Sequence, residues 1–354
     1  MFAAGERNRL SGKLSISIVV ATLDRPEGLR QCLRSLTEQT MPRPFEIIVV
    51  DNNPASGVTA PVLVEFPGVV PVTEPRRGLA YARNKGFIAS TGQIVVTTDD
   101  DITMPREWLG RLTAPFDRPE VMVVTGNVIP RELETRAQQL FEAYGGLGRG
   151  LQPQIADGTC FHRFRSAVPT WKLGATANAA FRAEIFSHPQ IGLMDEALGP
   201  GMPSGVGEDT YLFYRVLKAG YTIVYEPNAF VWHQHRRGMA DFQRQLYNYS
   251  KGHVAYHLTT LFRDHDLRAL VQIGMMVPAW HILRAVRRLC GTSQYPLLLI
   301  LLEVSGNLAG PWSLWRSRMR VRREGRSGTY IPVARRSATA AGSGQLAQAR
   351  NLKA

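Results

Sequence analysis

Short runs of β-branched residues alternate with helical patterns from residue 15 to about residue 128 of this 354-residue chain. The runs have the length of buried strands and cover residues 15–22, 45–50, 69–73, 93–98 and 121–128. Between them lie three helical patterns: one begins near Pro26, and the others cover residues 78–89 and 105–116. Strands and helices in alternation are typical of βαβ units. The sequence therefore predicts an α/β fold with a mostly parallel sheet.

The second part of this region is less regular. Residues 145–165 are rich in glycine and poor in periodicity, so we expect a mobile loop there. Residues 207–219 have a helical pattern, and residues 221–232 read as two short strands broken at Pro227.

The pattern changes to helices alone beyond Gly238, which predicts a domain boundary there. We expect residues 1–238 to form the α/β domain and residues 239–336 to form a helical region. Residues 337–354 are composed largely of Ala, Gly, Ser and Gln, a composition typical of a disordered tail.

Acidic residues follow three of the predicted strands: Asp24 the first, Asp51 the second, and Asp99, Asp100 and Asp101 the fourth. Ligands of parallel sheets collect beyond the carboxyl ends of the strands. Asp24 alone is better explained as a turn former or helix cap. Three consecutive carboxylates repel one another, and a hard cation such as Mn²⁺ or Mg²⁺ relieves that repulsion. A solvated loop is the alternative.

Several other classes of protein lose support from what the sequence lacks. No GxGxxG follows the first strand and no GxxxxGK[ST] is present, which disfavours dinucleotide redox chemistry and P-loop hydrolysis. The three cysteines, Cys32, Cys160 and Cys290, are too far apart in sequence to suggest a zinc site or disulfides, and they fit a reducing compartment. Asp-rich strand ends without a P-loop favour a diphosphate held through its cation.

A set of short motifs is a specific signal when the motifs are taken together and in order, although each motif alone is weak. The motifs occupy residues 19–26, 48–53, 77–86, 99–101, 174–182, 207–209 and 232–235. In order and spacing they resemble family 2 glycosyltransferases, over roughly residues 15–237. The resemblance implies a GT-A fold and transfer of a sugar from a nucleotide diphosphate donor, usually with inversion of the anomeric centre.

The resemblance also implies roles for individual residues on the donor side. The backbone around Thr22 and the carboxylates of Asp24 and Asp51 would hold the base and ribose. Asp99 and Asp101 match the DxD positions and would bind the ribose and the Mn²⁺ or Mg²⁺ ion. Some family members use the middle carboxylate, so Asp100 is a competing ligand.

Basic and small residues before and on the predicted helix at 78–89 complete the donor side: Arg77, Gly78, Arg83 and Asn84. The basic groups among them could reach the diphosphate. The alternative for these residues is an exposed helical face with ordinary salt bridges. His233 would close the metal shell or bind a phosphate. A lone histidine beside Trp232 more often fills the core, so this role depends on the family resemblance.

The resemblance also implies that the acidic pair Glu208 and Asp209 lies on the acceptor side. Inversion by single displacement needs one carboxylate that takes the proton of the attacking hydroxyl, and Asp209 is the expected base. Its alternative role is to balance the positive end of its helix. Trp171 and Gly174 are predicted to form the floor of the acceptor site, with tight packing as the alternative.

The net charge of +13 is unevenly distributed, because residues 1–262 contribute only +2. The C-terminal arginines alternate with Trp, Met and Val rather than with stacking aromatics, so nucleic acid is not an expected partner. An anionic membrane surface fits better.

Two apolar runs lie in the C-terminal region, at residues 269–283 and 296–315. Only the second is about long enough to span a bilayer, which needs ~20 apolar residues. A hairpin of two spans would place Arg284, Arg287 and Arg288 on the side opposite the other arginines, against the positive-inside rule. Helices lying in the interface, with arginines at the headgroups, avoid this conflict. The alternative is a buried appendage or oligomer interface.

Residues 1–9 lack the apolar core of a signal peptide, so we expect peripheral or monotopic attachment to the cytoplasmic face of the cell membrane. The QxxRW motif of processive relatives is absent at Gln243, which favours transfer of a single sugar. The sequence thus predicts a metal-dependent inverting glycosyltransferase acting on a glycan or lipid-linked acceptor. The alternative is a catalytically silent protein of the same fold that binds a nucleotide sugar or glycan.

Overall fold

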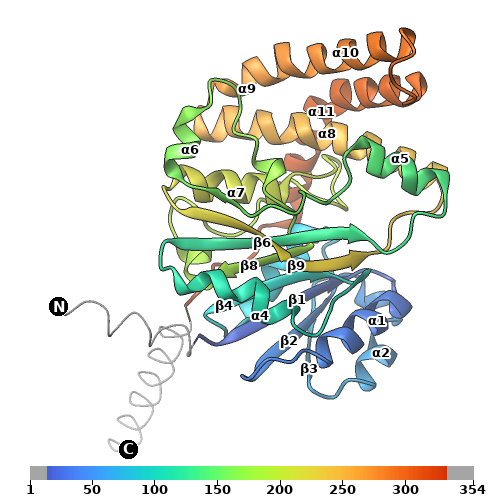
Figure 1. Cartoon of the computed structure of the whole chain (residues 1–354). Coiled ribbons are helices and arrows are strands. Elements are labelled where there is room, and N and C mark those ends of the chain that lie inside the picture. Colours follow the sequence, from blue (N-terminus) through green and yellow to red (C-terminus); the bar gives the residue numbers. More distant parts are fainter. Residues whose placement is uncertain (1–13, 333–354) are drawn as a thin grey trace, which may run out of the picture.

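The computed structural model describes residues 14–332, and its centre is a nine-stranded sheet (Figure 1). The strands are β1 Ile16–Thr22, β2 Phe45–Asp51, β3 Val69–Thr73, β4 Ile94–Asp99, β5 Ile102–Thr103, β6 Val121–Pro130, β7 Gln154–Ala156, β8 Asn178–Arg182 and β9 Thr222–His233. Their order is β3-β2-β1-β4-β8-β6-β9-β5, and β7 pairs with β9. The five strands predicted between residues 15 and 128 are confirmed as β1, β2, β3, β4 and β6.

Most strands of the sheet run in one direction. β3, β2, β1 and β4 are mutually parallel, and β6 and β9 form a second parallel pair. β8 lies between β4 and β6 and is antiparallel to both, so these two groups share one direction. The predicted α/β class with mostly parallel strands is confirmed.

Helices cover both faces of the sheet. They are α1 Pro26–Thr37, α2 Ala60–Val64, α3 Leu79–Ala89, α4 Trp108–Thr113, α5 Arg136–Tyr144, α6 Gly158–Arg163, α7 Glu208–Lys218, α8 Met239–Asp264, α9 Arg268–Val271, α10 Val277–Leu289 and α11 Leu297–Glu324. In β1, Ile18 and Val20 pack with the buried side of α1, whereas Val19 and Ala21 face the core shared with α3 and α7. This two-sided burial explains why both faces of the strand carry apolar residues.

Two details of the predicted secondary structure were wrong. The expected mobile loop at residues 145–165 contains β7, which pairs with β9, and α6, whose N-cap Asp157 accepts a hydrogen bond from the Cys160 N–H at 2.8 Å. β9 is one continuous strand, because Pro227 falls at a register shift against β6, where no ladder hydrogen bond is required of it. β5, β8 and α5 were not expected.

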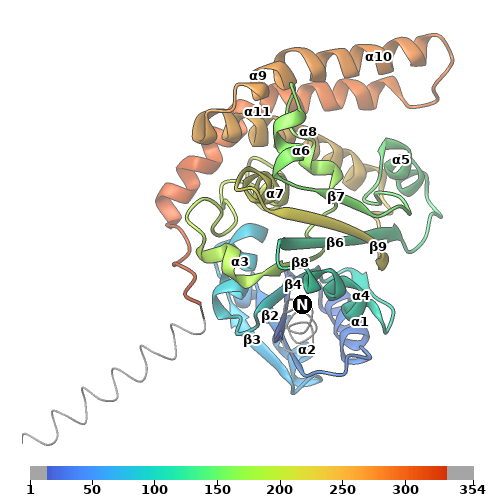
Figure 2. The ribbon, with the colours of Figure 1, turned by 60° about the vertical axis from the view of Figure 1, so that its left-hand side comes forward.

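α8, α10 and α11 form the end of the molecule farthest from α1 and α2, with α10 outermost (Figures 1 and 2). The end of α11 returns to the sheet domain beside α3, where the Tyr81 hydroxyl donates to the Gly325 carbonyl at 3.0 Å. The division at residue 238 stays a prediction, and the tail predicted at residues 337–354 lies outside the described residues.

Candidate active site

A cleft of about 710 Å³ opens at the carboxyl ends of β1 and β4. The position follows from the register, since Thr22 pairs with Asp51 and Ala21 pairs with Asp99, so these strand ends share one edge. The predicted site residues that line the cleft are Thr22, Arg77, Gly78, Arg83, Asp99, Asp100, Asp101, Trp171, Gly174, Glu208, Asp209 and His233. Asp24, Asp51 and Asn84 were also predicted there, but they do not line it.

Asp24 and Asp51 are joined to each other through Asn53. The Asn53 amide donates to both oxygens of Asp24, at 3.0 and 2.9 Å, and its backbone N–H donates to Asp51 Oδ1 at 2.9 Å. The hydrogen bonds from Asn53 and Ser56 lower the pKa of Asp24. Both carboxylates therefore have a clear role in shaping the loops beside the cleft.

The neighbouring Asn52 does line the cleft, but it was not predicted as a site residue from the sequence. Its side-chain oxygen accepts from the Gly78 N–H at 2.9 Å, and its amide donates to the carbonyls of Glu74 and Arg76. Asn52 thus fixes the loop that carries Arg77 and Gly78. The Asp-Asn-Asn turn after the second predicted strand was the available signal.

Asp100 is tied into the protein rather than free to bind a ligand. Its Oδ2 accepts from the Thr22 hydroxyl at 2.8 Å and its Oδ1 accepts from Arg25 at 3.1 Å. Burial raises the pKa of Asp100 to about 6. Because both oxygens are occupied, Asp100 is a poor competitor for a metal ion. Arg25, which also donates to Asp101 at 2.6 Å, was another residue missed.

Asp101 and His233 face each other across a short gap. Asp101 Oδ1 is buried, has no hydrogen-bond partner among the residues that the structure describes, and lies 3.5 Å from His233 Nε2. Burial lowers the pKa of His233, which favours the neutral imidazole that binds metals. Two ligands at ~2.1 Å from one ion lie at most ~4.2 Å apart, so both atoms could bind the same Mg²⁺ or Mn²⁺ ion.

These two residues do not complete a metal shell by themselves. In the part of the chain that the structure describes, no group of three or more His, Cys, Asp or Glu side chains is close enough to hold an ion. Asp99 lines the same cleft, but its Oδ1 is paired with Arg83. The oxygen and nitrogen donors fit a hard or borderline cation whose other ligands come from outside the chain.

Arg83 is buried and bridges the two acidic motifs. Its guanidinium lies 2.6 Å from Asp99 Oδ1 and 3.3 Å from Glu208 Oε1, and it donates to the Thr176 hydroxyl at 2.5 Å. The alternative of an exposed helical face is wrong for this residue, because only 2% of the side chain is exposed. Arg83 reaches the cleft, yet it acts chiefly as the internal counter-ion of both carboxylates.

The acidic pair at the start of α7 divides into a buried and an accessible member. Glu208 is buried, and burial together with the charge of Asp209 raises its pKa. Asp209 is half-buried, and its Oδ1 accepts from the Thr210 N–H at 2.6 Å and hydroxyl at 3.1 Å. The second oxygen of Asp209 has no partner among residues 14–332, so this carboxylate can accept a proton in the cleft.

The loop before α7, residues 195–207, forms one wall of the cleft and has little regular structure. Four of its glycines have positive φ angles, and Gly201 lies so close to Gly78 that an added Cβ would be 3.0 Å from the Gly78 Cα. Asn84 holds the start of this loop, because its amide bonds both the N–H and the carbonyl of Met194. This position does not fit the predicted contact of Asn84 with the donor.

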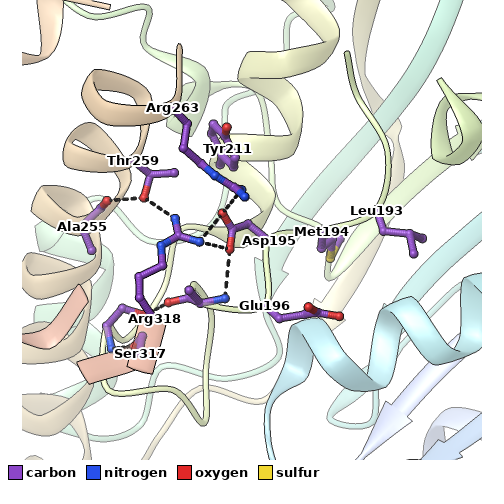
Figure 3. A network of polar contacts seen from close by, with 12 residues as sticks. Leu193, Met194, Asp195, Glu196, Tyr211, Ala255, Thr259, Arg263, Ser317 and Arg318 are labelled. Atoms are coloured by element: carbon purple, nitrogen blue, oxygen red, sulfur yellow. Dashed lines mark hydrogen bonds and ion pairs between the residues drawn. The ribbon is translucent and has the colours of Figure 1, made fainter. Parts of the chain in front are cut away.

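Helices α8 and α11 hold the same loop from outside (Figure 3). Asp195 accepts from Arg263 of α8 at 2.7 Å and from Arg318 of α11 at 2.7 and 2.8 Å. Burial by itself would raise the pKa of Asp195, but the two arginines hold it below its ordinary value. Ser317 of α11 also accepts from the Ser204 N–H at 2.9 Å. The helical region therefore supports the wall of the cleft.

The far side of the cleft is built largely from α8, which the sequence argument assigned to membrane association alone. Asn248, Tyr249, His253 and Tyr256 of α8 line it. Trp171 packs edge-on against His253, with ring centroids 5.1 Å apart. No local motif marks the residues of α8, because their place in the cleft depends on how α8 docks.

Gly174 also borders the cleft, and an added Cβ would lie 2.6 Å from Thr125 of β6. The close contact satisfies the tight-packing alternative for this glycine. Its backbone can still approach a ligand, since the residue lines the cleft.

Comparison with known proteins gives one family and several relatives. The model of the family described as "Glycosyl transferase family 2" matches residues 17–188. The pre-mycofactocin glycosyltransferase of Mycobacterium tuberculosis is 28% identical over 232 residues, which are 64% of this chain and 44% of that protein. The succinoglycan biosynthesis protein ExoM of Rhizobium meliloti is 31% identical over 229 residues, 62% of this chain and 66% of that protein. The chain thus spans less than half the length of the first relative.

Among solved structures, the mannosyltransferase PcManGT from Pyrobaculum calidifontis, in complex with GDP-Man and Mn²⁺, has a TM-score of 0.48 and 19% sequence identity. The alignment covers 93% of this chain and 80% of that chain. Crystallised residues 1–349 of TarS from S. aureus have a TM-score of 0.49 at 16% identity, over 70% of this chain and 66% of that chain.

Proposed function

Since the chain belongs to glycosyl transferase family 2, we propose that it is a metal-dependent inverting glycosyltransferase that moves one sugar from a nucleotide diphosphate donor. The observation that carries the proposal is the meeting of two acidic groups in one cleft: Asp99 and Asp101 after β4, and Asp209 at the start of α7. The first group suits a cation and a diphosphate. The second supplies a carboxylate with a free oxygen.

On the donor side, Thr22 and the loop of Arg77 and Gly78 would contact the nucleotide. Asp101 and His233 would hold a Mn²⁺ or Mg²⁺ ion, with Asp99 nearby. When bound, such an ion supplies charge neutralisation for the departing diphosphate. Arg77 is exposed at the cleft and would meet a phosphate, whereas Arg83 is already paired.

On the acceptor side, Asp209 would remove the proton of the acceptor hydroxyl as that oxygen attacks the anomeric carbon. Its Oδ1 is fixed by Thr210, which orients the free Oδ2. Glu208 has a raised pKa and is paired with Arg83, so it is better suited to position Asp209 than to act as the base. Single displacement with one base carboxylate inverts the anomeric centre.

A glycan or lipid-linked acceptor fits the wall built from α8, which offers Tyr249, His253 and Tyr256 together with Trp171. Aromatic rings present apolar faces with a polar edge, a combination suited to sugar rings. The absence of the QxxRW motif from the sequence is consistent with transfer of a single sugar.

The outer helices support attachment to a membrane surface. Two helical stretches, Arg268–Leu289 and Leu297–Glu324, are long and apolar enough to cross a membrane by length and composition. Only 11% of the apolar window in the first stretch is buried. Trp280, Trp312 and Trp315 are more than half exposed, as expected of interfacial anchors.

One expectation about this surface was wrong. Arg284 does not point to lipid headgroups, because it pairs with Glu303 of α11 at 2.6 Å and only 11% of its side chain is exposed. That pair joins α10 to α11. We propose that the outward faces of these two helices lie in the interface of the cytoplasmic leaflet, without spanning it.

The central experiment tests the base. The purified chain is incubated with UDP- and GDP-sugars and Mn²⁺, and release of the nucleotide diphosphate is measured with and without glycan acceptors. Asp209→Asn should lower turnover by about 10²–10⁴-fold, the usual contribution of a general base. Binding of UDP or GDP should persist. Asp117→Asn, which changes an exposed aspartate outside the cleft, is the matched control. Full turnover by Asp209→Asn would remove Asp209 as the base.

A second experiment tests membrane attachment by sedimentation with vesicles. Binding to phosphatidylglycerol vesicles should exceed binding to phosphatidylcholine vesicles and should weaken as salt rises. Trp312→Ser should reduce it severalfold. Val64→Ser, which removes an apolar side chain that is 82% exposed on α2, should leave it unchanged. Equal recovery of wild type and Trp312→Ser with the vesicles would contradict the assignment of this face.

A further inference from the structure

A buried chain of polar contacts runs from Asp101 to helix α5. His233 Nδ1 lies 2.7 Å from His235 Nδ1, and His235 Nε2 lies 2.8 Å from Glu142 Oε1. The His235 side chain is 1% exposed and its ring packs edge-on against Phe141 at 4.8 Å. Both nitrogens of His235 therefore have fixed partners, and nothing in the proposed transfer mechanism uses them.

The partners decide where each proton sits. An ionised carboxylate only accepts hydrogen bonds, so Glu142 requires the proton of neutral His235 to be on Nε2. His235 Nδ1 is then a lone pair, and it must accept from His233 Nδ1–H. His233 is thereby left with its lone pair on Nε2, the atom that lies 3.5 Å from the unpartnered Asp101 Oδ1.

The geometry points to His235 and Glu142 as positioning residues that hold His233 in the tautomer whose Nε2 can bind a divalent cation together with Asp101. The inference rests on the proposed metal-dependent function and adds residues to it. Histidine ligands in metal sites commonly donate their second ring N–H to such a partner, which fixes the tautomer and the ring orientation. Here the partner is a second histidine, and its own tautomer is set by a carboxylate on a different helix.

The opposite tautomer would disable the site. If His233 carried its proton on Nε2, that N–H would point toward Asp101 and occupy the lone pair needed for an ion. The 3.5 Å separation is longer than an ordinary N–H···O hydrogen bond, and Asp101 Oδ1 has no partner within the described part of the chain. Removing Glu142 frees His235 to donate from Nδ1, and His233 can then adopt the wrong tautomer.

The first test reads the tautomer directly. Long-range ¹H–¹⁵N spectra of the ¹⁵N-histidine-labelled full chain should show His233 protonated at Nδ1 in the wild type. In Glu142→Ala the signal should shift to a mixture or to the Nε2–H form. Protonation of His233 at Nε2 in the metal-free wild type would overturn the inference, whether or not the enzyme proves to need a metal.

The second test measures binding of Mn²⁺ alone by the electron paramagnetic resonance signal of the free ion. Glu142→Ala should weaken binding by about 10–100-fold, as loss of a metal ligand's partner usually does. Glu142→Gln keeps an acceptor oxygen and should recover most of the affinity. Glu134→Ala removes an exposed charge just before α5 and is the matched control. Thermal unfolding of each variant checks that the fold persists.

The outcomes separate this inference from the proposed function. Loss of Mn²⁺ binding in His233→Ala but not in Glu142→Ala would overturn the role of the relay and leave the metal site standing. Equal Mn²⁺ binding by wild type, His233→Ala and Glu142→Ala would overturn both. Selective loss in Glu142→Ala with rescue by Glu142→Gln would support both.

Discussion

Replacing Arg83 by methionine removes a buried cation that joins the two acidic motifs. Methionine keeps an unbranched apolar stem but lacks the guanidinium, so the change removes the charge and its hydrogen bonds. Asp99 and Glu208 lose their contacts with the guanidinium, and their side chains are 26% and 4% exposed. We expect the buried Glu208 to account for most of the destabilisation, because water can solvate Asp99.

The expected loss follows from this burial. Removing one partner of a buried ion pair costs about 3–5 kcal/mol. Glu208 can escape part of that cost by taking up a proton, since burial already raises its pKa to about 8. We therefore expect Arg83→Met to lower the free energy of unfolding by about 3 kcal/mol at pH 7, the lower end of that range.

The loss should also depend on pH. Glu208 has a folded-state pKa above its unfolded value, so its contribution to stability falls as pH rises through that window up to about 8. Without Arg83 the pKa of Glu208 rises further, so the Arg83→Met deficit should grow as pH rises through about 8. Adding Glu208→Gln to Arg83→Met removes the unpaired carboxylate. The double variant should recover about 1–2 kcal/mol of the free energy of unfolding, because the effects of residues in contact are not additive.

Urea unfolding of the full chain, followed by tryptophan fluorescence, measures these differences. Arg77→Met removes an exposed arginine of the same segment and should change stability by less than about 0.5 kcal/mol. The reasoning is refuted if Arg83→Met costs less than about 1 kcal/mol, or if Glu208→Gln adds to the loss instead of relieving it.

Two further predictions concern the contacts of the helical region. Asp195→Asn weakens the ion pairs with Arg263 and Arg318, whose side chains are 40% and 26% exposed. We expect the free energy of unfolding in urea to fall by about 2 kcal/mol, less than for a fully buried pair. A fall below about 0.5 kcal/mol would contradict the conclusion that these pairs support the wall of the cleft. Burial lowers the pKa of His253 to about 4 and also lowers the pKa of His257. Below about pH 6.5 the unfolded chain therefore binds more protons than the folded chain. The free energy of unfolding should fall as pH is lowered from 7 toward 4. His257→Phe should flatten this slope in urea unfolding at pH 7 and pH 5, and an unchanged slope would mean that His257 does not contribute.

Much of the fold could be read from the sequence, and the errors have physical causes. β1, β2 and β4 are short runs rich in Ile and Val that end in polar residues, and this signal is local. β7 and β8 were missed because each is short and is stabilised by strands distant in sequence, β9 and β4. Pro227 was read as a strand break because the bulge that tolerates it involves β6.

The candidate site shows the same division. Asp99, Asp101 and Asp209 stand in motifs and were predicted, and they do line one cleft. Arg25, Asn52 and the α8 residues were missed, because their side chains matter only through partners far along the chain. Asn84 was placed on the donor from its motif, whereas its amide bonds Met194, 110 positions away in sequence.

The sequence by itself determined the α/β class, the family and the edge of the sheet at which the acidic residues meet, because strand patterns and the polar residues at strand ends are local. Only the tertiary structure decided which of those residues are free and which are paired. The pairing of β5 with β9, Ile102 opposite His233, brings Asp101 beside a histidine more than a hundred residues away. The sequence assigned α8 and α11 to membrane association. Their docking on residues 195–207 shows that α8 also forms a wall of the cleft and that α11 supports it. Burial and charge pairing depend on the whole packed chain, and no local pattern contains them.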